Sequence, residues 1–119
     1  TLIQLTQFLT ANGTLIIAVP NHLSHDAKFY KSEWAAYDLP RHLYHFDSAS
    51  IHALADKVGL KVVSQLPMHF DSYYVSLLSE KNLKVSFSFL RGLYHGYISN
   101  LSAKRTNEYS SLIYVLQKK

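Results

Sequence analysis

The sequence predicts an α/β fold, in which helices and strands alternate, and three observations support this prediction. An unbroken apolar run covers Leu15–Val19, as expected for a strand that is buried on both faces of a sheet. A second strand is predicted over Lys61–Leu66, after a helical segment. The last segment, Tyr109–Leu116, alternates and is rich in β-branched residues, which is typical of a strand. No simple crossover joins the last two strands, so the final strand is expected to run antiparallel.

Two helices flank the predicted strands. Leucines at helical spacing predict a first helix over residues 2–9, and Gly13 provides a stop signal because glycine adopts the left-handed conformation without steric cost. A second helix begins at Asp47 or Ser48, either of which can cap its N-terminus, and ends at Gly59. Between the first strand and this helix, residues 22–47 show no regular period and are predicted to form a long aromatic loop.

A helical insertion, residues 71–105, separates the last two predicted strands. A short helix is expected over 71–80 and a longer one over 88–102. The longer helix carries an apolar stripe made of Leu90, Leu93, Tyr94, Tyr97, Ile98 and Leu101. We expect this stripe to pack on the sheet, with an oligomer contact and a substrate lid as the alternatives. Gly92 and Gly96 lie in the same helix and are expected to allow close helix packing.

Composition bounds the class of protein. A chain of 119 residues is at most one domain, and 48% hydrophobic with 17% charged residues indicates a globular chain. The absence of cysteine excludes disulfides, thiolate metal sites and a cysteine nucleophile. The net charge of +4 is scattered, which does not favour nucleic-acid binding. No apolar run approaches the ~20 residues that span a bilayer, so we expect no membrane partner and a cytoplasmic location.

Four histidines form two H-x-x-H pairs, His22/His25 and His42/His45. Imidazoles are common zinc ligands, and four of them could complete a tetrahedral site. The spacing is loose, however, and both pairs fall in the predicted loop. The sequence therefore favours loop histidines and no metal site.

The stretch "YDLPRHLYHFD", residues 37–47, leaves the carboxyl end of the first strand, where ligands of open α/β sheets bind. His42 could act there as a general base, and Arg41 could bind a carboxylate or phosphate in bidentate fashion. In the structural alternative, Arg41 pairs with Asp38 and His42 bonds to the backbone. The aromatic residues of this loop either wall a substrate pocket or pack in the core. These are Trp34, Tyr37 and Tyr44.

A strand ending in "VPN", an aromatic loop and "DLPRHLYHFDSASIHALADKVGLKVV" together resemble the C-terminal half of a class I S-adenosylmethionine-dependent methyltransferase, in the branch related to ubiquinone-biosynthesis methyltransferases. The resemblance covers nearly the whole chain and implies a Rossmann-like sheet of seven strands. Leu15–Val19 would be strand five, Lys61–Leu66 strand six and Tyr109–Leu116 strand seven. The last strand would lie antiparallel between the other two.

The resemblance implies methyl transfer from S-adenosylmethionine to an oxygen, nitrogen or carbon of a small-molecule substrate. His42 or His45 would be the catalytic base for a hydroxyl acceptor, and the substrate-binding residues would be Arg41, Trp34, Tyr37 and Tyr44. The glycine-rich turn that cradles the cofactor is missing, because no G-x-G follows a strand. The chain, residues 1–119, opens at Thr1 inside a helical pattern, and we expect a substrate-side fragment that is inactive alone.

The sequence leaves two other functions open. The chain could be a binding or assembly module without chemistry of its own, using the helices of residues 71–105 to bind a partner. A homo-oligomer could form through these helices or through the exposed edge of the sheet. Methylation of RNA or protein is the other alternative, and strong salt-dependent RNA binding would support it.

Overall fold

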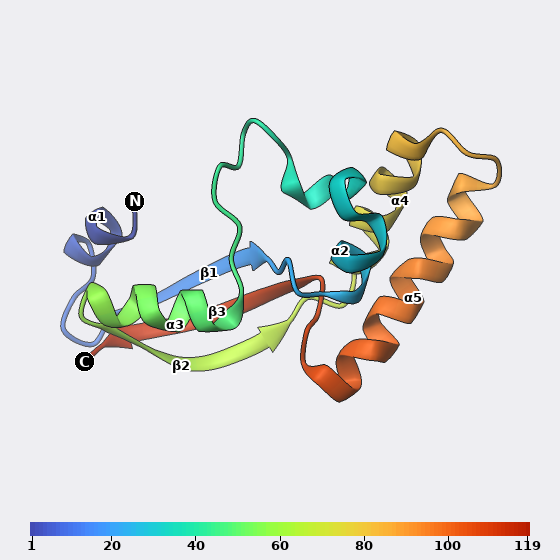
Figure 1. Cartoon of the computed structure of the whole chain (residues 1–119). Coiled ribbons are helices and arrows are strands. Elements are labelled where there is room, and N and C mark those ends of the chain that lie inside the picture. Colours follow the sequence, from blue (N-terminus) through green and yellow to red (C-terminus); the bar gives the residue numbers. More distant parts are fainter.

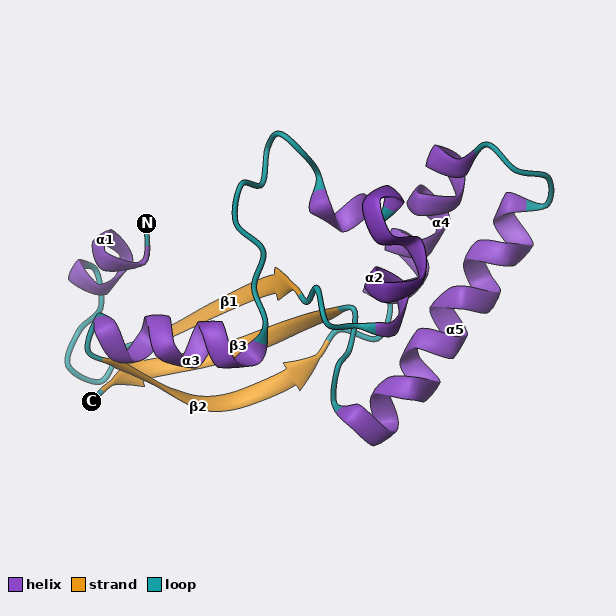
Figure 2. Cartoon of the chain, in the orientation of Figure 1, coloured by secondary structure: helices purple, strands orange, loops and turns teal.

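The computed structural model describes residues 1–119, and helices and strands alternate along it as the sequence predicts (Figure 1, Figure 2). In chain order the elements are α1 (Leu2–Gln7), β1 (Thr14–Pro20), α2 (His25–Tyr30), the 3-10 helices η1 (Lys31–Glu33) and η2 (Ala35–Tyr37), α3 (Ser48–Lys57), β2 (Leu60–Pro67), α4 (Asp71–Leu83), α5 (Ser88–Thr106) and β3 (Ser111–Lys118). Two groups of elements result, a sheet with α1 and α3, and a helical lobe beside it (Figure 1).

The sheet has three strands in the order β1-β3-β2. The last strand therefore lies between the other two and is antiparallel to both, so β1 and β2 run parallel to each other. Tyr114, in the middle of β3, pairs with Ile17 on one side and with Gln65 on the other. The antiparallel direction expected for the last strand is thus present.

One face of this sheet holds the first hydrophobic cluster, on which α3 packs (Figure 1). Its fully buried members are Ile51, Ala55, Leu60, Leu112, Tyr114 and Leu116. Successive side chains of a strand point to opposite faces, so Ile16 lies on the face opposite Ile17. Ile16 is 65% exposed, and Leu66 is 48% exposed. The helices of this structure therefore cover one face of the sheet far better than the other.

The helical lobe is joined to the sheet by a buried carboxylate, Asp26 of α2. Three groups donate hydrogen bonds to it, each at 2.7 Å: the indole Nε1 of Trp34 and the hydroxyls of Ser99 and Ser110. These residues come from the loop after α2, from α5 and from the segment that leads into β3. The helical lobe also holds a second hydrophobic cluster, made of Ala27, Tyr30, Trp34 and Val75.

Helices α4 and α5 form a closely packed hairpin, as the two glycines predict. A Cβ added at Gly92 would lie 2.9 Å from the Cα of Leu77, and one added at Gly96 would lie 2.8 Å from the Cα of Tyr73. The prediction that the apolar stripe of α5 packs on the sheet is wrong. Short side chains bring the backbones together, so α5 turns its small residues inward and leaves its larger ones exposed. The exposed ones are Leu90, Tyr94, Tyr97 and Leu101.

The region predicted to be an irregular loop contains the helix α2. Ser24 caps it by accepting a hydrogen bond from the backbone N–H of Ala27 at 3.3 Å. With only six residues, this helix is too short to show a clear hydrophobic period. The sequence-based prediction for this segment therefore missed a helix that positions Asp26.

Candidate functional site

A cavity of about 160 Å³ lies at the carboxyl end of β1, which is where the sequence predicts a ligand site. An apolar cavity of about 150 Å³ can hold one benzene molecule, so the space suits a small ring or group. The cavity is lined by Ala18, Val19, Pro20, Ala36, His42, Tyr44, His45 and Phe46. Larger cavities occur in the helical lobe, but this is the one that combines a strand end with two imidazoles.

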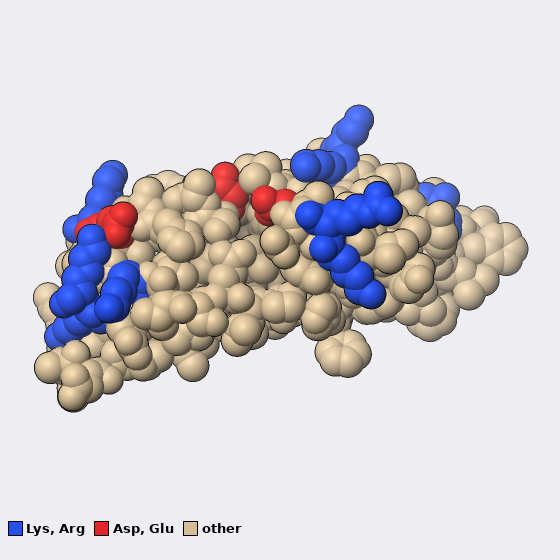
Figure 3. Space-filling model, turned by 90° about the horizontal axis from the view of Figure 1, so that it is seen from below, with Lys and Arg blue, Asp and Glu red and all other residues tan.

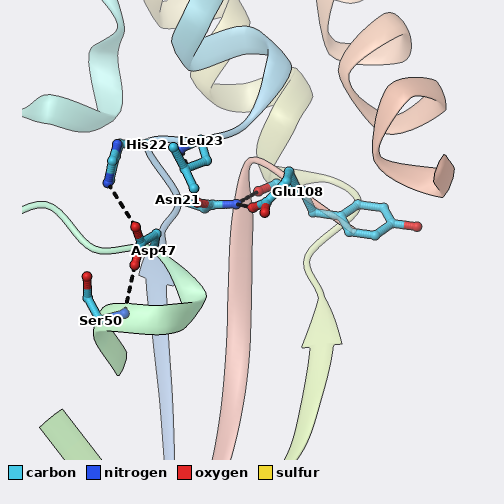
Figure 4. A network of polar contacts seen from close by, with 7 residues as sticks. Asn21, His22, Leu23, Asp47, Ser50 and Glu108 are labelled. Atoms are coloured by element: carbon cyan, nitrogen blue, oxygen red, sulfur yellow. Dashed lines mark hydrogen bonds and ion pairs between the residues drawn. The ribbon is translucent and has the colours of Figure 1, made fainter. Parts of the chain in front are cut away.

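The turn after β1 holds the returning loop in place. Asn21 forms an isolated parallel bridge with Phe46, and the backbone N–H of His22 donates to the carbonyl of Phe46 at 3.3 Å. The side-chain amide of Asn21, only 1% exposed, donates to Glu108 at 2.6 Å and to the carbonyl of Tyr109 at 3.1 Å (Figure 4). The wall of the cavity is therefore tied both to β1 and to the segment before β3.

An ionised carboxylate stands beside this wall. Asp47 caps α3 by accepting a hydrogen bond from the backbone N–H of Ser50 at 2.7 Å, as the sequence predicts (Figure 4). The Nε2 of His22 lies 3.7 Å from the other oxygen of Asp47. The hydrogen bonds from Ser50 are the main reason that the pKa of Asp47 is lowered from its ordinary value, and His22 adds a smaller electrostatic contribution. Asp47 is thus a fixed negative charge at the start of α3.

Three of the predicted site residues line the cavity together: His42, Tyr44 and His45. A fourth, Tyr37, packs edge-to-face against the ring of His45, with the centroids 4.7 Å apart. On its other side Tyr37 meets Trp34 in the same geometry at 5.0 Å. The ring of His45 is therefore held by an aromatic chain that begins in the core of the helical lobe.

Two predicted residues are not brought to this cavity. The side chain of Arg41 is 83% exposed and lies 4.0 Å from Asp38, the ion pair that the structural alternative expects. Trp34 is 2% exposed and donates its indole N–H to Asp26, so it serves the core. Trp34 and Tyr37 also border a separate cavity of about 440 Å³ against α4. A role for Arg41 or Trp34 at the histidine cavity is not supported by this arrangement.

Neither a metal centre nor a complete cofactor cradle is formed by the residues of the chain. No group of three or more His, Asp or Glu side chains is arranged to hold a metal ion, so the two H-x-x-H pairs do not converge. Gly13 and Gly59 precede strands, and the other two glycines lie within α5. None of the four glycines therefore forms a backbone turn after a strand.

The residues that sequence reasoning missed are those whose partners are far away in the chain. The sequence indicates Asn21 only as the end of the "VPN" strand, although it joins β1 to Glu108 across 87 residues. Nothing local in the sequence indicates that Glu108 is its partner. Searches of protein-family models and of curated protein sequences found no match to this chain.

Proposed function

We propose that this chain is the acceptor-side part of an S-adenosylmethionine-dependent methyltransferase that acts on a small molecule. The observation that supports this proposal most strongly is the cavity at the carboxyl end of β1, with His42 and His45 in its wall. The strand order agrees with it, because β3 lies antiparallel between two parallel strands. That is the arrangement which the resemblance implies for strands five, six and seven.

In this proposal the chain binds and orients the acceptor. The cofactor, held mainly by strands upstream of this chain, supplies an electrophilic methyl group. Aromatic side chains of the cavity wall, Tyr44 and Phe46, offer flat surfaces to an acceptor ring. Alignment for in-line displacement accounts for much of the rate in such a reaction, and a hydroxyl acceptor must also lose its proton.

In this proposal His42 or His45 takes that proton. Both line the cavity, and a neutral imidazole is an effective base near neutral pH. His42 is exposed on its other side, so a proton can pass from it to solvent. His45 is fixed against Tyr37, which limits the positions its ring can take. The two imidazoles therefore have different supports, and single substitutions can tell their contributions apart.

The proposal is tested by following the transferred methyl group. The chain, joined to its upstream sequence, is incubated with methyl-labelled S-adenosylmethionine and a small-molecule extract, with RNA, or with protein. The proposal expects label in the small-molecule fraction and a large loss in His42→Gln or His45→Gln. His52→Gln, an exposed position on α3, is the matched control. Label only in RNA or protein, or transfer that does not depend on either cavity histidine, would contradict it.

A further inference from the structure

The end of the helical hairpin exposes a group of large apolar side chains. We call residues 83–90, which join α4 to α5, the hairpin tip. Phe87 is 78% exposed, and Phe89 and Leu90 are each 63% exposed. Leu83 and Val85 are exposed as well. A contiguous group of exposed apolar side chains on a protein surface often marks an interaction site.

The shape of the molecule makes the tip accessible. The chain extends over 52 × 31 × 18 Å, and the tip lies at the end opposite the two chain termini (Figure 1). No helix of the chain is long and apolar enough to cross a bilayer. The apolar side chains at an end of the molecule are covered most completely by a deformable environment that surrounds that end.

The segment that forms the tip and the rest of α5 carries charges of one sign. Residues 81–107 contain no Asp or Glu. Lys81 precedes the tip and Lys84 lies within it, and neither has an ion-pair partner. Glu80, which precedes Lys81 in the chain, is fully buried and accepts hydrogen bonds from Arg91 at 3.0 Å and from the hydroxyl of Tyr30 at 2.8 Å. Two acidic residues of the preceding loop approach the end of α4: Asn82 donates to the carbonyl of Glu33 at 3.4 Å, and Asp38 borders a cavity together with Lys81. On the face seen in Figure 3, Lys and Arg side chains gather both at the sheet end and over the helical half of the molecule.

An apolar cavity leads down from the tip between α4 and α5. Its volume is about 300 Å³, and it is lined by Tyr74, Leu77, Leu78, Lys81, Ser88 and Phe89. Four of these six side chains are hydrophobic, and Lys81 is the charged residue among them. This combination fits an acyl chain that enters beside a phosphate group.

We propose that the hairpin tip inserts into the surface of an anionic lipid bilayer, with Phe87, Phe89 and Leu90 below the headgroups and Lys81 and Lys84 at the phosphates. Aromatic and leucine side chains favour this interfacial depth, and nearby lysines add attraction to anionic lipids. This proposal departs from the sequence-based expectation of no membrane partner. It does not depend on the proposed methyl transfer, so either can fail without the other.

Charge also decides between a lipid surface and the other occupants of such a patch. A symmetric contact between two copies through the tip would bring Lys84 of each copy close to the same residue of the other, and residues 83–90 offer it no acidic partner. A nucleic acid would be met by a basic surface, but Phe87 and Leu90 would gain little from a phosphate backbone. An anionic bilayer satisfies both the cations and the apolar side chains.

The test is flotation of the chain with vesicles of phosphatidylcholine alone or mixed with phosphatidylglycerol. We expect binding to the mixed vesicles, little binding to the neutral ones, and release by salt. Lys81→Gln with Lys84→Gln should weaken binding about 25-fold, because each basic residue near an anionic bilayer contributes roughly fivefold. Lys57→Gln with Lys61→Gln, which removes the same charge at the sheet end, should leave binding within a few-fold of the wild type.

The apolar contribution is tested separately. Phe87→Asn with Leu90→Gln should abolish binding, because asparagine tolerates the left-handed backbone at position 87, where φ is 58°. Ile3→Gln with Phe8→Asn removes two exposed apolar side chains at the other end and should have no effect. Since the chain has no cysteine, Phe87→Cys also accepts a single environment-sensitive fluorophore, whose emission should shift to the blue on binding. The same label on Phe8→Cys should not respond.

Several outcomes would overturn the proposal. One is the absence of binding to the mixed vesicles by a folded wild-type chain. Another is binding that survives the Phe87→Asn, Leu90→Gln change, or that falls equally in the matched controls. A wild-type dimer that this change converts to a monomer, without any vesicle binding, would assign the tip to a second copy. Salt-sensitive RNA binding through Lys81 and Lys84, again without vesicle binding, would assign it to a nucleic acid.

Discussion

Replacing Asp26 with alanine should lower the free energy of unfolding by about 3–5 kcal/mol, because it removes the acceptor of three buried hydrogen bonds. The carboxylate is fully buried, and its donors Trp34, Ser99 and Ser110 all lie at 2.7 Å. A hydrogen bond to a charged group contributes about 1.5–3 kcal/mol, and an orphaned buried donor costs a similar amount. Relief from burying a charge offsets part of this loss. A typical domain is stable by about 5–15 kcal/mol, so the change is large.

Asp26→Asn removes the negative charge at this position and keeps a side chain of nearly the same shape. One carboxylate oxygen accepts from both Trp34 and Ser110, and the other accepts from Ser99. An asparagine can keep its carbonyl toward the first pair and turn its amide toward the hydroxyl of Ser99, which can then accept. We therefore expect a smaller loss, about 1–2 kcal/mol, mainly from the weaker neutral hydrogen bonds.

Urea denaturation followed by far-ultraviolet circular dichroism measures these differences, and an unchanged m value would show that the same surface unfolds in each variant. Asp56→Ala is the matched control, since Asp56 is 66% exposed and pairs only with Lys119 on the surface. It should change stability by less than about 1 kcal/mol. A loss of less than about 1 kcal/mol for Asp26→Ala would refute the view that this carboxylate joins the helical lobe to the sheet.

Gly96→Ala should lower the free energy of unfolding by about 1–3 kcal/mol in chemical denaturation, because the added Cβ would lie 2.8 Å from the Cα of Tyr73. This loss is expected despite the higher helix propensity of alanine. Equal or greater stability would contradict the close packing of α4 and α5. With the upstream part present, His42→Gln should lower kcat about 100-fold or more for a hydroxyl acceptor, and His52→Gln should not; an unchanged kcat would exclude His42 as the base. Burial is the main reason that the pKa of His95 is lowered from its ordinary value of 6.5. The unfolded chain therefore binds a proton at His95 more readily than the folded chain does. Stability should be greatest above pH 6.5 and fall as the pH decreases below it. Thermal denaturation against pH should show this fall in the wild type and a weaker one in His95→Phe, and equal slopes would refute the assignment.

Local signals predict much of this fold. The apolar run of β1 and the capping carboxylate of α3, Asp47, are properties of adjacent residues, and both elements lie where the sequence places them. The strand-end rule likewise predicts a ligand cavity after β1, with His42 in its wall. For Arg41 the sequence offered both a ligand-binding role and an ion pair with Asp38, and the structure shows the ion pair.

Long-range polar contacts and helix orientation were not predictable. The hydroxyl donors to Asp26 are 73 and 84 residues away, and a serine in a sequence gives no sign of such a partner. The orientation of α5 was predicted wrongly because an apolar stripe was taken as the buried face. In a hairpin of two helices, the side with Gly92 and Gly96 allows closer approach, so backbone packing decided which face is inside.

Isothermal titration with S-adenosylhomocysteine, the demethylated product of the proposed cofactor, tests the central claim most directly. S-adenosylhomocysteine is added to this chain and to the same chain extended by its upstream sequence. Our account predicts no binding to this chain alone, since no glycine turn follows a strand in it, and clear binding to the extended one. Binding to neither form would contradict the assignment to methyl transfer.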